Sequence, residues 1–82
     1  MFREIIGVEP LSDYRLRVSF AEGVTKIYDV APLFEKIPVF GSPLRTPRVF
    51  DDVYVDVGGH GIVWNDALDL SCDELWENGH AV

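Results

Sequence analysis

The chain has 82 residues, 48% of them hydrophobic, and a formal net charge of −7. A chain this short folds around one core, and its apolar content is too high for a disordered protein. Cys72 is the only cysteine, which excludes an internal disulfide and a cysteine-based zinc site. No segment approaches the ~20 apolar residues that cross a bilayer. We therefore expect a single domain over residues 1–82, located in the cytoplasm and not in a membrane.

The charges are unevenly distributed along the chain. All seven lysines and arginines lie in residues 1–48, whereas residues 49–82 contain eight aspartates and glutamates and no lysine or arginine. Nucleic-acid binding through phosphate contacts needs clustered cations, so this distribution argues against it. An anionic surface favours a basic protein partner instead. The alternative is that the carboxylates only keep the surface soluble.

The first two predicted strands are Ile5–Glu9 and Tyr14–Phe20, separated by the turn-forming residues Pro10–Asp13. Apolar and polar residues alternate throughout the second strand, which is typical of a strand with one buried face. The residues predicted to be buried are Tyr14, Leu16, Val18 and Phe20.

A hairpin loop, Ala21–Gly23, is expected to lead into a third strand, Val24–Val30. Gly23 suits the left-handed backbone position that such a loop requires. These three strands would form an antiparallel meander.

Two short helices are predicted next, at Pro32–Lys36 and at Pro47–Asp51. Proline favours the first turn of a helix, and the prolines in this segment prevent a long one. We expect Thr46 to cap the second helix. The loop between the helices should direct Phe40 and Leu44 inward.

A glycine-rich loop lies between two further predicted strands, Val53–Val57 and Ile62–Trp64. In the first of them, alternation predicts that the three valines face the core. A phosphate-binding loop leads from a strand into a helix, whereas Gly58–Gly61 connects two strands. We therefore interpret this loop as a hairpin turn with His60 exposed at its tip.

The C-terminal helix has the clearest local signals in the chain. Ser71 and Glu74 have the spacing of a capping box, in which each side chain bonds the backbone of the other residue. Leu75 and Trp76 are expected to pack on the sheet, and Gly79 to end the helix.

The sequence contains no set of residues typical of a catalytic or metal site. His60 and His80 lack the spacing of helical metal ligands, and residues 66–73 lack the pattern of a calcium loop. Cys72 begins a helix, but the neighbouring carboxylates Asp73 and Glu74 disfavour a reactive thiolate. We therefore expect no cofactor, no metal and no enzymatic activity.

An ordered set of short motifs runs through most of the chain. Its members are PLSDYRL at residues 10–16, Phe20-x-x-Gly23, Asp29-Val30-x-Pro32-Leu33, Pro43-Leu44-Arg45-x-Pro47, Val63-Trp64, and Ala67-Leu68-Asp69-Leu70 followed by Leu75. This set resembles the bacterial family of domains of unknown function 2442. The one visible departure is Asn65–Leu68, where we would expect a proline and an Asn-Gly turn after the tryptophan.

The resemblance implies an α+β fold, in agreement with the predicted elements. The fold would be a small single domain with an antiparallel strand meander, short helical turns, a β-hairpin and a C-terminal helix packed on the sheet. The resemblance implies no established activity. Members of such families are often encoded beside another small gene, an arrangement similar to a toxin and antitoxin pair.

These observations lead to the hypothesis of a noncatalytic, antitoxin-like module that binds a basic protein partner, such as the product of an adjacent gene. The predicted partner contacts are Asp51, Asp52, Asp56, Asp66, Asp73 and Glu77. One alternative is a nucleic-acid-binding accessory domain that uses Arg15, Arg17, Arg45 and Arg48. A small ligand-binding domain is another alternative, and open sheet edges would also allow a homodimer.

Overall fold

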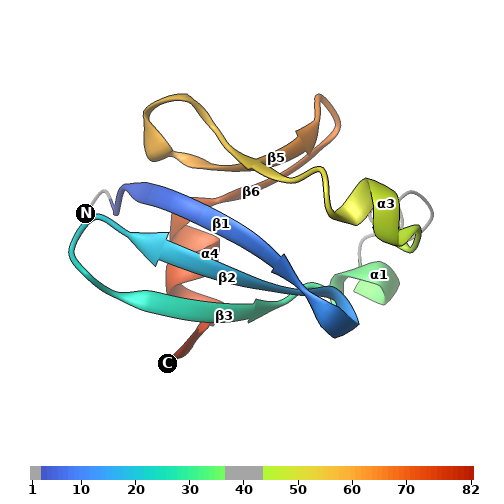
Figure 1. Cartoon of the computed structure of the whole chain (residues 1–82), viewed down its shortest axis with the longest axis horizontal. Coiled ribbons are helices and arrows are strands. Elements are labelled where there is room, and N and C mark those ends of the chain that lie inside the picture. The colour runs from blue at the N-terminus through green and yellow to red at the C-terminus, as the bar shows by residue number, and fades with distance from the viewer. Residues whose placement is uncertain (1–2, 37–43) are drawn as a thin grey trace.

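Two antiparallel sheets and a C-terminal helix enclose the core of the computed structural model, which describes residues 3–36 and 44–82 (Figure 1). The large sheet has the strand order β1-β2-β3-β7, and the small sheet has the order β4-β5-β6. The strands are β1 (Ile5–Leu11), β2 (Arg15–Phe20), β3 (Thr25–Asp29), β4 (Tyr54–Val55), β5 (Gly61–Asn65), β6 (Leu68–Ser71) and β7 (His80–Ala81). The helices are α1 (Leu33–Lys36), α3 (Pro47–Phe50) and α4 (Cys72–Asn78), with two 3-10 turns, η1 (Ser12–Tyr14) and η2 (Val57–Gly59). This arrangement confirms the predicted α+β fold.

The alternating pattern of β2 decides how the large sheet packs. Leu16 and Val18 are fully buried and Phe20 is nearly so, whereas Arg15 and Arg17 are exposed. Strand β2 pairs antiparallel with both β1 and β3, so it forms the centre of the predicted meander. Helix α4 lies behind the large sheet in Figure 1 and contacts β3.

The turn between β1 and β2 differs from the prediction, because Tyr14 is not a strand residue. It ends η1 with a φ of 59°, next to Asp13 with a φ of 61°. Left-handed backbone is rare for such side chains and persists where contacts hold it in place. The Tyr14 ring packs edge to face against Phe34 and Phe50, at centroid distances of 5.1 and 5.3 Å. Its hydroxyl also donates a hydrogen bond to the carbonyl of Arg45. Because of these contacts, Tyr14 leaves the predicted strand Tyr14–Phe20, and β2 begins one residue later, at Arg15.

The loop between β2 and β3 agrees with its prediction. Gly23 has a φ of 84°, and its N–H donates to the carbonyl of Phe20 at 3.0 Å. The left-handed position therefore falls at the expected glycine.

The two short helices also form near the predicted positions. Thr46 precedes α3, but it contributes its backbone carbonyl, which accepts from the N–H groups of Val49 and Phe50, and its side chain makes no capping bond. Leu44 is fully buried, as predicted. Phe40 lies outside the described residues.

The glycine-rich loop connects β4 to β5, which pair antiparallel, so its interpretation as a hairpin turn is confirmed. His60 is exposed, as predicted. The prediction for Val57 is wrong, because this side chain is 89% exposed and belongs to η2. The Asp56 carboxylate accepts from the Val57 N–H at 2.8 Å, which turns the chain away from the strand direction. Val53 and Val55 do pack against the core.

Two strands of the structure have no counterpart in the sequence prediction. Strand β6 pairs with β5 after a tight turn in which the Asn65 side chain accepts from the Ala67 N–H at 2.8 Å. Strand β7 has only two residues and pairs with Lys26 and Ile27 at the edge of the large sheet. The predicted hairpin is therefore part of a three-stranded sheet.

Helix α4 begins and ends where the sequence predicts. The Ser71 hydroxyl accepts from the Glu74 N–H at 3.1 Å, and Leu75 is fully buried. The Glu74 carboxylate, however, accepts from the hydroxyl of Tyr28 at 2.7 Å, so only the serine half of the capping box matches the prediction. Gly79 ends the helix in extended backbone. Across residues 3–36 and 44–82, no helix has the length and apolar character needed to cross a membrane.

Candidate functional site

The uneven charge of the sequence gives the small sheet an excess of carboxylates, whereas the large sheet carries charges of both signs. The carboxylates of residues 51–71 all belong to the small sheet or to its connections, whereas Arg3, Arg15, Arg17 and Lys26 lie on or beside the strands of the large sheet. The small sheet lies on one side of the large sheet in Figure 1. The six predicted contact residues are all exposed. The molecule therefore has an anionic side built on β4, β5 and β6.

One face of the small sheet is packed on the core and the other is open. Strand pairing places Val55, Ile62 and Leu70 in one row across the sheet, and this row faces the core. The neighbouring row must point to the opposite face, because side chains alternate along a strand. That row, on the open face, consists of Tyr54, Val63 and Asp69.

A hollow of about 160 Å³ lies at Gly61, which pairs with Ser71 across the sheet. Asp56 and Asp69 both line it, and both are exposed. The remaining lining residues are His60, Ile62 and Leu70. The structure thus brings a predicted contact residue together with Asp69, which the prediction omitted. The alternation of Leu68-Asp69-Leu70-Ser71 would have placed Asp69 on the open face, had this segment been recognised as a strand.

Two other predicted contact residues lie on α4, which follows β6 directly and contacts β3, β5 and β6. Asp73 and Glu77 line a depression of about 380 Å³ together with Arg3 and Trp76. The Arg3 guanidinium lies 4.0 Å from the centroid of the Trp76 ring and forms an ion pair with Glu22 at 3.0 Å. A cation of the chain itself is therefore already present beside this second acidic pair.

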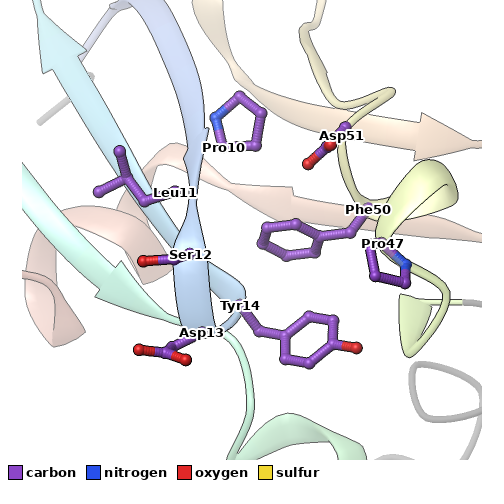
Figure 2. A pocket seen from close by; sticks show the side chains of 8 residues that line it. All are labelled: Pro10, Leu11, Ser12, Asp13, Tyr14, Pro47, Phe50 and Asp51. Atoms are coloured by element: carbon purple, nitrogen blue, oxygen red, sulfur yellow. The ribbon is translucent and has the colours of Figure 1, made fainter.

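Asp51 lines a third depression, of about 440 Å³, at the strained turn between β1 and β2. Figure 2 shows the Phe50 ring directed from α3 toward the end of β1, with Tyr14 beneath it and Pro10 and Asp51 above. The other lining residues are Leu11, Ser12, Asp13 and Pro47. Asp52 and Asp66 lie in connections, after α3 and between β5 and β6. The six predicted residues thus fall into separate groups and do not form one cluster.

The four arginines of the alternative hypothesis are partly engaged by other groups. Arg17 forms an ion pair with Glu9 at 2.6 Å, and Arg15 lies directly opposite Asp29 in the pairing of β2 with β3. The Arg45 guanidinium lies 5.5 Å from the Phe34 ring centroid. Arg48 is exposed on α3.

The most strongly perturbed titratable group is the hydroxyl of Tyr28. Burial raises its pKa, and so does the hydrogen bond that it donates to Glu74. The hydroxyl is therefore a neutral donor, and an acid-base role for it at neutral pH has no support from this geometry. The side chain joins β3 to α4.

The described part of the chain contains no group of three or more histidine, cysteine, aspartate or glutamate side chains that could hold a metal ion. Cys72 is buried, and its Sγ lies 3.9 Å from an oxygen of Asp73. The Cys72 side chain is thus part of the core and not of an open site.

A comparison with solved structures finds a similar fold in NE0471 from Nitrosomonas europaea, which is described as a candidate DNA-binding protein. The TM-score is 0.81 and the sequence identity is 28%, over 95% of this chain and 49% of the other. The chain thus spans about half the length of that protein. No protein with a curated description matches the chain. Residues 5–81 match the sequence model of the family described as "Protein of unknown function (DUF2442)", and the chain belongs to this family.

Proposed function

We propose that the protein is a noncatalytic module whose acidic half, residues 49–82, recognises a basic protein partner. The observation that supports this proposal is that the small sheet and its connections carry carboxylates and no lysine or arginine. Opposite potentials steer partners together and set specificity, so an anionic side selects a cationic surface.

The electrostatics within the chain support the proposal. Both ion pairs between arginine and glutamate in residues 3–36 and 44–82, Arg3–Glu22 and Arg17–Glu9, lie before residue 49. No lysine or arginine pairs with a carboxylate of residues 49–82 in the described structure. The carboxylates of the anionic side are therefore not paired with lysine or arginine, which supports contact with a cationic partner.

The product of an adjacent gene is the first partner to test, because an antitoxin-like role would place the two genes together. The two proteins would be purified separately and their affinity measured by calorimetry at two salt concentrations. Binding should weaken as salt rises, because ions screen exposed charges beyond ~10 Å at 0.1 M.

A matched pair of variants tests the acidic half directly. One variant replaces the six predicted contact residues by their amides, and the control does the same to the six acidic residues of the segment 1–48, so that both change the net charge equally. The first variant changes Asp51, Asp52, Asp56, Asp66, Asp73 and Glu77. The control changes Glu4, Glu9, Asp13, Glu22, Asp29 and Glu35. Only the first variant should lose the partner. Equal losses, or binding that salt does not affect, would contradict the proposal.

Nucleic-acid binding is a second candidate, and the description of NE0471 is the observation that favours it. This chain covers 49% of that protein, so the description of the whole does not assign DNA binding to the shared half. A mobility shift on DNA or RNA at low salt tests this candidate. A shift that disappears in the R15A/R17A double variant would replace our proposal by this one.

A further inference from the structure

We infer that the partner docks on the open face of the small sheet, and that one of its arginine or lysine side chains sits over Gly61 between Asp56 and Asp69. This inference rests on the proposed function and adds to it a location and a chemical class of contact. The evidence for it is the pairing of β4, β5 and β6, which determines the side chains on the open face.

The open face combines apolar contact area with negative charge. Tyr54 is 54% exposed and lies in one row with the half-buried Val63 and with Asp69. Protein interfaces typically have an apolar centre and a polar rim. A tyrosine ring can pack against the aliphatic part of a basic side chain or attract its charged end.

The hollow at Gly61 matches one basic side chain better than it matches a cofactor. Its volume of about 160 Å³ is smaller than the ~300–1,000 Å³ of typical small-molecule pockets. Asp56 and Asp69 both line it, so a cation placed there would lie near two carboxylate side chains. Residues 49–82 contain no lysine or arginine, and the one basic side chain that lines the hollow is the imidazole of His60.

The same charges argue against a second copy of the chain as the occupant. A two-fold symmetric dimer through this face would bring the Asp56 and Asp69 side chains of both copies into one interface. Like charges in an interface are repulsive and favour a partner of opposite charge. The pair on α4 is a weaker candidate, because Arg3 already lies beside Asp73 and Glu77.

The test uses the full chain labelled with ¹⁵N and an oligo-arginine peptide as the probe, observed by NMR at low salt. The largest shifts are expected at Tyr54, Gly61 and Ser71, in and beside the hollow. The D56N/D69N variant should bind the peptide about tenfold more weakly, because it removes both carboxylates of the hollow. Asparagine keeps an acceptor oxygen for the Val57 N–H, so the hairpin should remain folded.

The D13N/E35Q variant is the matched control, because it changes the net charge by the same amount in η1 and α1, at two exposed residues outside the predicted contact set. Its affinity should stay within about twofold of the wild type. Wild-type binding with the largest shifts on α4, or with equal weakening in both variants, would overturn the docking site and leave the proposed function intact. Concentration-dependent shifts at the open face without peptide would identify a second copy as the occupant and overturn the inference. Failure of the wild type to bind the peptide at all would refute the proposed function and the docking site together.

Discussion

Replacing Gly59 by alanine tests how the hairpin of the small sheet is held against the large sheet. Gly59 is buried with a φ of 74°. A Cβ atom there would lie 2.7 Å from the carbonyl oxygen of Ile5 and 3.0 Å from its nitrogen, so the backbone of β1 or of the hairpin would have to move. Gly23 is the natural control, because its φ is 84° but a Cβ atom there would meet nothing within 4 Å.

The two substitutions share one cost and differ in another. Left-handed backbone costs an alanine ~1–2 kcal/mol, and this is the whole expected effect of Gly23→Ala. Gly59→Ala adds the steric overlap with β1, for which overpacked sites suggest a further ~1–3 kcal/mol. In a domain of this size each kcal/mol lowers Tm by ~4–8 °C. Gly59→Ala should therefore lower Tm by more than about 10 °C, and Gly23→Ala by clearly less.

Urea and thermal unfolding followed by tryptophan fluorescence would measure both variants against the wild type. Equal destabilisation by the two substitutions would refute the reasoning, because it would mean that the hairpin does not press against β1. The outcome also bears on function, because this hairpin carries Asp56 to the edge of the proposed docking surface.

Three further predictions concern single side chains, each measured by chemical unfolding. Tyr28→Phe should reduce the loss of stability in alkali. The pKa of Tyr28 is raised in the folded state, so its stabilising contribution is complete below the ordinary value of 10.0 and is lost as pH rises above it. Equal alkaline profiles for the two proteins would contradict this. Ser71→Ala should lower the free energy of unfolding by about 1 kcal/mol, because the Glu74 N–H loses its cap. The control Ser12→Ala should change it by less than about 0.5 kcal/mol. The reverse order would exclude the capping role of Ser71. Tyr14→Phe should cost about 0.5–1.5 kcal/mol by removing the hydrogen bond to the carbonyl of Arg45, and no change would mean that ring packing alone holds the turn.

The candidate site was only partly predictable from the sequence. The absence of basic residues from the second half identified the anionic side, and Asp56 was named as a contact residue. Asp69, which lines the same hollow, was not predicted. The segment Leu68–Ser71 is too short and too close to a helix start to be recognised as a strand without its partner β5. Pairing across the sheet, and not proximity in sequence, brings Asp69 to the hollow that Asp56 also lines.

The sequence by itself determined the elements whose signals are local. Alternation fixed the buried face of β2, Gly23 fixed a turn, and Ser71 fixed the start of α4, because each depends on the residues immediately around it. The tertiary structure alone decided the backbone of Tyr14 and the partner of Glu74, because ring packing and a hydrogen bond from Tyr28 come from distant parts of the chain. It also decided which carboxylates share a surface, since Asp56 after β4 and Asp69 in β6 line one hollow only when the backbone hydrogen bonds of β5 to both strands are formed.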